Sequence, residues 1–174
     1  MTEITLRGVQ PGDIPAITRI YADAVRHGTA SFEIEPPDEA EMAQRQQTLI
    51  ANGYPYLVAE SAGTLAGYAY AGPYRARPAY RWTVEDSVYV GPEFYRRGLG
   101  TWLLARLIAD AQAGGFRQMI AVIGDSAQTA SIALHERAGF AHIGAMRSVG
   151  FKHDKWLDTV LMQRALGKGD TAPP

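Results

Sequence analysis

A strand that runs through a basic, glycine-containing turn into an apolar helix occupies the middle of this sequence. Residues 82–90 are rich in β-branched and aromatic side chains, which is typical of a strand. The run Arg96-Arg97-Gly98-Leu99-Gly100 follows, and residues 101–113 then place leucines and isoleucine on one helical stripe. Backbone N–H groups at a helix start, together with the positive end of the helix dipole, attract anions. This unit therefore predicts a turn that binds a phosphate or pyrophosphate group.

The turn differs from the two best-known phosphate-binding patterns. Gly100 is followed by Thr101-Trp102-Leu103, so the turn fits neither the dinucleotide fingerprint G-x-G-x-x-G nor the lysine-containing P-loop. We therefore expect a different phosphate-bearing cofactor.

Both strand and helix patterns occur along the rest of the chain. Strands are predicted at residues 4–9, 56–60, 65–70, 82–90, 119–123, 141–149 and 156–163, and helices at 13–25, 38–52, 101–113 and 126–138. Asp13, Asp38 and Ser126 are candidate N-caps of three of these helices. The turn Ala62-Gly63 joins two strands in an antiparallel hairpin. The elements together predict an α/β protein with helices flanking a central sheet.

The length of 174 residues, of which 47% are hydrophobic, fits one domain. We place this domain at residues 1–166 and predict a flexible tail at 167–174. The net charge of −1 comes from interspersed acids and bases, so nucleic acid is not an expected partner. The chain has no signal-peptide pattern and no apolar run long enough to span a membrane, so we expect a soluble, cytoplasmic protein without a membrane partner.

Two kinds of chemistry are disfavoured by the residue types. The chain has no cysteine, which excludes a cysteine nucleophile that forms a thioester and excludes thiolate zinc sites. None of the four histidines pairs with another at the spacing of helix-borne metal ligands, so no metal is expected.

The central strand and turn, together with a later helix, resemble the GNAT superfamily of acetyltransferases. The superfamily motif [QR]-x-x-G-x-[GA] matches residues 95–100, with Tyr95 in its first position, and residues 130–140 resemble the helix beside the cofactor. The resemblance implies a GNAT fold of the α+β kind, with a mixed, mostly antiparallel central sheet flanked by helices, and acetyl-CoA as the co-substrate. The acetyl-CoA-binding residues that it implies are Val88, Tyr89, Val90, Tyr95, Arg96, Arg97, Gly98, Leu99, Gly100, Thr101, Gln128 and Ser131.

Within that superfamily, further stretches resemble the phosphinothricin and methionine sulfoximine N-acetyltransferases. The stretches are 71–77, 82–90, 121–124 and the run Gly150-Phe151-Lys152-His153. They imply acetyl transfer to the amino group of a small amino-acid-like substrate, and a homodimer. A guanidinium group matches the carboxylate of such a substrate, which favours Arg75 and Arg77. The candidate substrate-binding residues are Phe32, Arg75, Arg77, Tyr80, Lys152 and His153, with Trp156 as a further pocket residue.

Glu85 and His135 are the candidate catalytic residues. An α-amino group with a pKa of roughly 8 is mostly protonated at neutral pH, so attack on a thioester benefits from a base, and the resemblance places Glu85 in that role. His135 stands where the superfamily usually has a tyrosine that protonates the departing thiolate. The alternative makes His135 the base and Glu85 its support. Asp86 should point to the opposite face of the strand, and we interpret it as structural.

Other functions are compatible with the same turn. A protein N-terminus or a polyamine is an alternative acceptor, although Arg75 and Arg77 argue against a polyamine. A non-catalytic acetyl-CoA sensor is a second alternative, and the presence of both Glu85 and His135 argues against it. Backbone N–H groups near residues 88–90 are candidate donors to the oxyanion.

Overall fold

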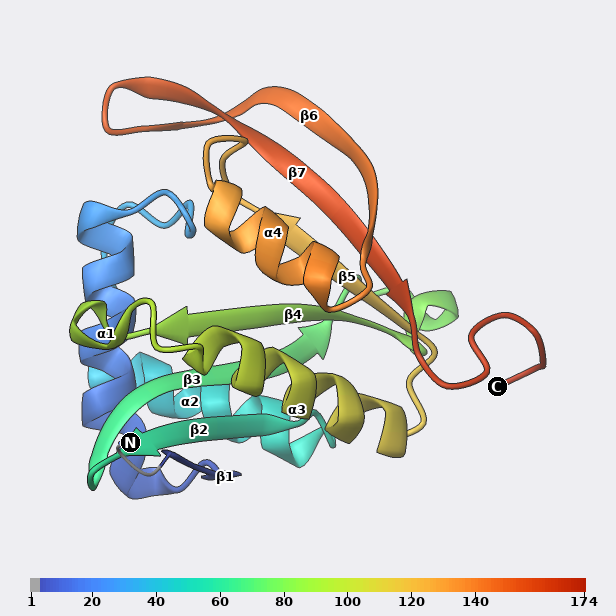
Figure 1. The fold of residues 1–174 in the computed structure, drawn as a ribbon, viewed down its shortest axis with the longest axis horizontal. Helices are drawn as coiled ribbons and strands as arrows, with labels where there is room; N and C mark the ends of the chain where they lie inside the picture. Colours follow the sequence, from blue (N-terminus) through green and yellow to red (C-terminus); the bar gives the residue numbers. More distant parts are fainter. Residues whose placement is uncertain (1–3) are drawn as a thin grey trace.

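The structure is a computed structural model that describes residues 4–174, so the first three residues of the predicted domain lie outside the described part. Its strands are β1 (Ile4–Gly8), β2 (Tyr56–Ser61), β3 (Thr64–Pro73), β4 (Thr83–Val90), β5 (Gln118–Ile123), β6 (Ala141–Lys152) and β7 (Lys155–Ala165). Its α-helices are α1 (Ile14–His27), α2 (Glu39–Ala51), α3 (Leu99–Ala113) and α4 (Thr129–Arg137) (Figure 1). Each of these elements was predicted, with similar bounds. Within the described residues, none of the helices has the length and apolar character needed to cross a membrane.

The strands form one sheet in the order β1-β2-β3-β4-β5-β7-β6. β4 and β5 run parallel, whereas the other neighbouring pairs in this order are antiparallel. The predicted mixed, mostly antiparallel sheet is therefore confirmed. The hairpin between β2 and β3 turns at Ala62 and Gly63, whose φ angles of 50° and 75° give the twist that suits a two-residue hairpin loop.

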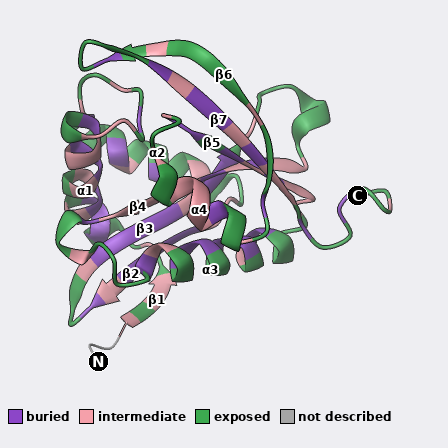
Figure 2. Ribbon diagram, turned by 45° about the horizontal axis from the view of Figure 1, so that its top comes forward, coloured by how far each residue is buried: buried purple, intermediate pink, exposed green. Residues whose placement is uncertain are grey.

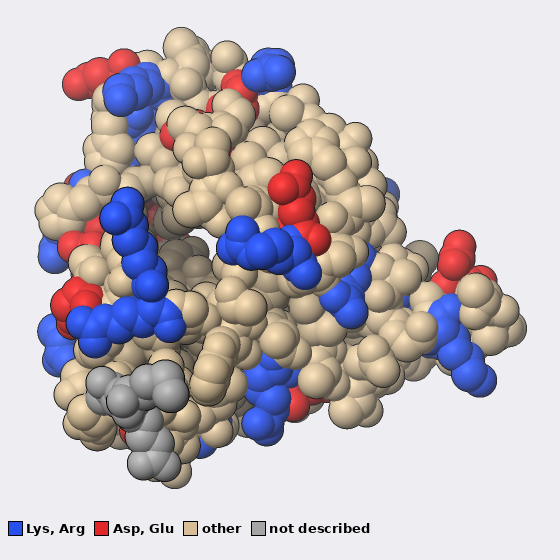
Figure 3. Space-filling model, in the orientation of Figure 1, with Lys and Arg blue, Asp and Glu red and all other residues tan. Residues whose placement is uncertain are grey.

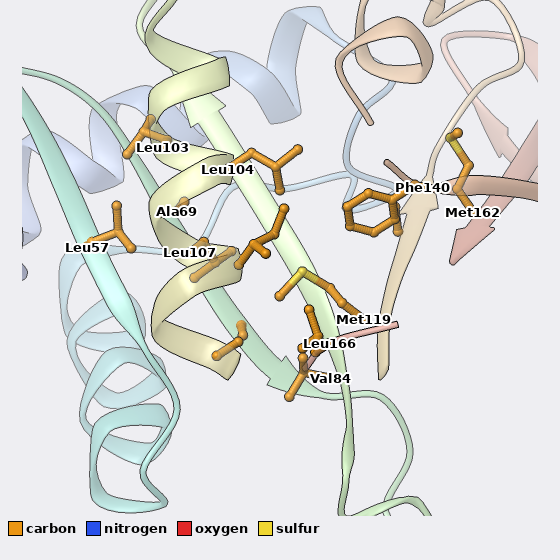
Figure 4. Close-up of a cluster of buried hydrophobic side chains, with 14 of the residues drawn as sticks. Leu57, Ala69, Val84, Leu103, Leu104, Leu107, Met119, Phe140, Met162 and Leu166 are labelled. Carbon is orange, nitrogen blue, oxygen red and sulfur yellow. The ribbon is translucent and has the colours of Figure 1, made fainter. Parts of the chain in front are cut away.

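Helices cover both faces of this sheet (Figure 1). On one face, α1 and α2 pack against Tyr56, Val58 and Tyr68 of β2 and β3. On the other face, leucines of α3 pack against strands β2 to β5, in the cluster of side chains that Figure 4 shows. Side chains of β4 alternate between these layers, so that Val84 packs on the α3 side and Tyr89 on the α1 side. Buried positions concentrate on the central strands, while β6 is mostly exposed (Figure 2).

The three predicted N-caps have different outcomes. Asp38 caps α2, because its Oδ1 accepts a hydrogen bond from a backbone N–H of the first turn at 2.8 Å. Asp13 stands at the N-cap of α1 but makes no cap bond, since its carboxylate accepts two hydrogen bonds of 2.8 Å from Arg7. Ser126 donates to Asp158 at 2.9 Å, and α4 begins later than predicted. In both failed predictions a side chain outside the helix replaced the cap bond: Arg7 of β1 for Asp13 and Asp158 of β7 for Ser126.

The last residues of the chain pack beside α3 and the start of β5. Leu166 is fully buried, and the N–H of Gly167 donates to Oε1 of Gln112 at 3.1 Å. The guanidinium group of Arg117 donates to three backbone carbonyl groups within residues 167–174. These contacts connect the segment that we predict to be a tail to the body of the domain.

Replacement of Leu104 by alanine tests the position of the core. Leu104 is 0% exposed between α3 and the sheet, so Leu104→Ala leaves a cavity and should lower the free energy of unfolding by about 2–5 kcal/mol. Urea denaturation followed by circular dichroism measures the change. Ile50→Ala is the control, because Ile50 is 47% exposed on α2 and should change stability by about 0.5 kcal/mol. Similar losses in the two variants would contradict this core.

Candidate active site

The site lies where β4 and β5 separate. These strands pair only from Thr83 with Gln118 to Asp86 with Ala121, and the remainder of β4, residues 87–90, has no strand partner on that side within the described chain. A cavity of about 880 Å³ occupies the opening, a size that suits a cofactor together with a small substrate. Figure 3 shows this face of the molecule hollowed near its middle, with Lys and Arg side chains on both sides of the opening.

Most of the predicted acetyl-CoA-binding residues line this cavity. Those that line it are Val88, Tyr89, Val90, Tyr95, Arg96, Gly100, Gln128 and Ser131. The other four, Arg97, Gly98, Leu99 and Thr101, lie in the same turn without lining it. Leu99 is buried in the core, and the guanidinium group of Arg97 stacks 5.3 Å from the ring centre of Phe94.

The turn before α3 has the geometry of an anion site. Gly98 is the N-cap of α3 with a φ of 79°, a left-handed conformation that favours glycine, and Arg96 has a φ of 63°. The N–H of Thr101 donates to the Gly98 carbonyl at 3.0 Å and begins the helical pattern. The N–H groups of Leu99 and Gly100 precede that bond, so they have no helical acceptor and can bind an anion.

Glu85 lies on β4 just before the strands separate, and it lines the cavity. Strand alternation directs Glu85 to the same face as Tyr89, on the side of α1. Burial first, and then the negative charge of Asp86, raise the pKa of Glu85 to about 7, while the positive charge of Arg75 acts in the opposite direction. A carboxyl group with this pKa is partly ionised at neutral pH and can accept a proton from a bound ligand.

His135 and Asp86 form a buried pair on the other face of β4. Nε2 of His135 lies 2.9 Å from Oδ2 of Asp86, and Nδ1 lies 2.7 Å from the carbonyl oxygen of Ser131. Burial by itself would lower the pKa of His135, but the hydrogen bond and charge of Asp86, with the Ser131 carbonyl, raise it overall. The structure therefore places Asp86, and not Glu85, in contact with His135.

The ring of Phe32 is packed between two glycines, Gly124 at the cavity wall and Gly150 on β6. A Cβ atom on Gly124 would lie 2.9 Å from this ring, and a Cβ atom on Gly150 would overlap it. Phe32 lines the cavity, as the prediction of a substrate-binding residue requires. Close packing against the two glycines fixes the loop between α1 and α2 at the mouth of the site.

Lys152 and His153 hold the same loop from outside the cavity. Nζ of Lys152 donates to the carbonyl oxygen of Ser31 at 2.7 Å, and Nε2 of His153 lies 3.2 Å from the carbonyl oxygen of Gly28. Burial lowers the pKa of Lys152, an effect that the charge of Glu33 partly offsets. Neither side chain lines the cavity. Within a single chain, both contact the loop that carries Phe32.

The remaining predicted substrate residues do not line the cavity of this chain. Arg75, Arg77 and Tyr80 belong to the loop between β3 and β4, where the guanidinium carbon of Arg75 lies 5.1 Å from the ring centre of Tyr74. Trp156 on β7 is 67% exposed and packs against the ring of another exposed residue of the same hairpin.

Comparison with known proteins assigns the chain to a family. Residues 16–140 match the Acetyltransferase (GNAT) family. The chain belongs to this family. It is 55% identical to the phosphinothricin N-acetyltransferase of Alcaligenes faecalis, over 98% of this chain and 86% of the relative. It is 42% identical to the L-methionine sulfoximine/L-methionine sulfone acetyltransferase of Pseudomonas aeruginosa, over 97% of this chain and 98% of the relative.

A solved structure agrees with the family and the fold. The GNAT superfamily phosphinothricin acetyltransferase of Sinorhizobium meliloti, crystallised in complex with AcCoA, superimposes with a TM-score of 0.96 at 51% identity. The match covers 100% of this chain and 94% of that protein. The predicted superfamily, the predicted fold and the predicted acetyltransferase class are therefore confirmed.

The cavity of this GNAT acetyltransferase also contains residues that the sequence did not single out. Tyr21, Ser31, Tyr70 and Thr159 line it. The hydroxyl of Tyr21 lies 3.0 Å from the hydroxyl of Ser31, and burial raises the pKa of Tyr21 to about 12. In the sequence Tyr21, Tyr70 and Thr159 have the spacing of ordinary helix or strand positions and Ser31 lies in a loop, so no pattern indicated a role for them. Among residues 4–174, no three His, Asp or Glu side chains group as a metal site would require.

Replacement of Gly150 by alanine tests the position of Phe32. Gly150 has a backbone conformation that any residue can adopt. Gly150→Ala therefore acts through the overlap of its methyl group with the Phe32 ring. We expect a loss of about 1–3 kcal/mol in the free energy of unfolding, measured by urea denaturation. Gly144→Ala, on the same strand, is the matched control because nothing lies within 4 Å of its added methyl group. Equal stability of the two variants would show that Phe32 lies elsewhere.

Proposed function

We propose that this protein transfers the acetyl group of acetyl-CoA to the amino group of a small amino-acid-like substrate, such as phosphinothricin or methionine sulfoximine. Membership of the GNAT family and the names of its relatives support the reaction and the substrate class. The chain has no cysteine to carry the acetyl group. We therefore assign direct attack of the amine within a ternary complex.

The residues of the cavity fit acetyl-CoA. The free N–H groups of Leu99 and Gly100 and the guanidinium groups of Arg96 and Arg97 would hold its pyrophosphate at the start of α3. The backbone of residues 88–90, which no strand of the described chain covers on the β5 side, would line the rest of its path. When bound there, acetyl-CoA supplies the acetyl thioester.

Glu85 carries the proposal, because its carboxyl group combines a position in the cavity with a pKa of about 7. A substrate ammonium group with a pKa of roughly 8 must lose a proton before it attacks the thioester. Glu85 accepts this proton directly or through one water molecule. Backbone N–H groups near residues 88–90 stabilise the negative charge that develops on the carbonyl oxygen. His135, on the opposite side of β4, assists the departure of the thiolate.

Substrate recognition is assigned to the predicted residues around the site. Phe32 contacts the cavity directly, while Lys152 and His153 fix its loop. Arg75 and Arg77, with Tyr80, are proposed to bind the substrate carboxylate, and their position outside the cavity of a single chain is compatible with a contribution across a dimer.

A homodimer through β6 and β7 is part of this proposal. β6 is a long edge strand of the sheet, and unprotected apolar edges of this kind favour pairing with another chain. Its exposed apolar side chains, with that of neighbouring β7, are Ile143, Met146, Val149, Phe151 and Trp156. A second copy of the chain would cover them and bring the last strands and the acceptor loops of the two copies together.

The replacement Glu85→Gln tests the base. It removes the proton acceptor while keeping the shape, so kcat should fall roughly 100-fold or more, while acetyl-CoA affinity stays nearly unchanged. In the unmodified enzyme kcat should rise with pH through about 7, as Glu85 loses its proton, and this rise should be missing in Glu85→Gln. Thiol release with a panel of amino acids that includes phosphinothricin and methionine sulfoximine measures the rates.

Glu136→Gln is the matched control, because Glu136 is exposed on α4 and should keep full activity. Full kcat in Glu85→Gln would remove Glu85 from its role as the base. Tight binding of acetyl-CoA without thiol release from any amine would instead support a sensor. A loss of turnover in His135→Ala, with acetyl-CoA binding intact, is expected from the role of His135.

Two isoleucines of similar exposure test the dimer. Ile143 on β6 is 58% exposed and Ile34 in the loop before α2 is 61% exposed. Ile143→Asp places a charge in the proposed interface and should convert the dimer to a monomer in sedimentation velocity, whereas Ile34→Asp should leave the dimer intact. A monomeric parent protein, or a dimer that both variants preserve, would contradict this interface.

A further inference from the structure

We propose that Asp86 is a positioning residue for the reaction, which keeps the ring of His135 charged and in a fixed orientation at the wall of the cavity. The inference rests on the proposed acetyl transfer and assigns a role to a residue that the sequence indicated as structural.

With Asp86 ionised, the hydrogen bonds of His135 require a proton on each ring nitrogen. Nδ1 lies 2.7 Å from a carbonyl oxygen, that of Ser131, and Nε2 lies 2.9 Å from Oδ2 of Asp86. Both partners are acceptors, whereas a neutral imidazole has a single N–H to donate. Both bonds are satisfied together when His135 is an imidazolium and Asp86 is a carboxylate.

Among the described residues, His135 is the one hydrogen-bond partner of the Asp86 carboxylate. Asp86 is 7% exposed and His135 is 4% exposed, so their charges are removed from water. Oδ1 of Asp86 is buried without a hydrogen-bond partner among the described residues. An unsatisfied buried oxygen costs stability, so its presence calls for an explanation, of which a role in a site is one. The charge of Asp86 is therefore matched by that of His135.

The pair lies where a fixed positive charge affects the reaction. Asp86 is the last residue of β4 that pairs with β5, and both members of the pair line the cavity. A paired backbone on one side and helix α4 on the other hold the imidazolium in place. Its charge would stabilise a departing thiolate from the α4 side, while Glu85 acts from the opposite face of the same strand.

No other charge near the end of α4 is directed at this ring in the described part of the chain. Glu136 and Arg137 are exposed on α4, and Arg164 of β7 donates to a backbone carbonyl after the helix. Asp86 is thus the charged group that controls His135, and its negative charge also raises the pKa of Glu85.

The replacement Asp86→Asn distinguishes a role of Asp86 in holding His135 charged from a role in stabilising the fold alone. Asparagine keeps an acceptor oxygen for Nε2 of His135 but removes the negative charge. The pKa of His135 should fall because burial is no longer opposed, and the pKa of Glu85 should fall because a neighbouring negative charge is lost. Activity requires ionised Glu85 and charged His135. Both limbs of the kcat profile against pH should therefore move to lower pH.

The profile is measured in the parent protein, in Asp86→Asn and in Asp110→Asn. Asp110 forms a surface ion pair with Arg106 on α3, so its replacement is the matched control and should move neither limb. We expect a shift of about one pH unit in the alkaline limb of Asp86→Asn, equivalent to a loss of roughly tenfold in activity at high pH. A lower kcat with both limbs unmoved would overturn the proposal, since a structural role predicts that result.

Nitrogen NMR of the imidazole groups tests the pair without any acceptor substrate, so its outcome is independent of the proposed function. The resonances of His135 are assigned by their absence in His135→Gln. In the parent protein His135 should titrate above the ordinary value of roughly 6.5. It should titrate at lower pH in Asp86→Asn. A neutral His135 ring at pH 6.5 in the parent protein would overturn the proposal even if Asp86→Asn failed to fold.

Discussion

The early end of pairing between β4 and β5 is the constraint on which the site depends. Parallel strands have no tight connection, so the chain crosses from β4 to β5 through α3, and the start of that helix lies at the opening. Because pairing stops at Asp86, the end of β4 presents free backbone groups to the cavity instead of to a neighbouring strand. The anion site, the candidate base and the histidine pair all border this one interruption of the sheet.

The alternation of side chains along β4 divides the chemistry between two faces. Glu85 faces the layer of α1, where burial and the charge of Asp86 raise its pKa to about 7, a value that suits the proposed role of proton acceptor. Asp86 faces the opposite layer, where its charge raises the pKa of His135. Of these two adjacent acids, Glu85 is placed to accept a proton, whereas Asp86 favours the protonated form of His135. Their side chains lie on opposite faces of β4, which keeps the two groups apart.

Residues at and outside the cavity wall hold the loop between α1 and α2 at the mouth of the cavity. Gly124 and Gly150 leave room for the ring of Phe32, and the buried ammonium group of Lys152 holds the neighbouring carbonyl of Ser31. The stretch from Gly150 to His153 therefore contributes to the cavity through the loop that it supports.

Local chemistry made much of this protein predictable from its sequence. The left-handed glycine at Gly98, the cap of α2 by Asp38 and the apolar stripe of α3 depend on residues close in the chain, so the turn and the elements around it could be inferred directly. The role of Asp13 and the partner of Ser126 could not, because each bonds to a side chain of another element, Arg7 of β1 and Asp158 of β7, that the pattern of a helix start does not reveal. The contact of Asp86 with His135 and the packing of Phe32 likewise needed the tertiary structure, since folding alone decides which side chains far apart in sequence share a buried space.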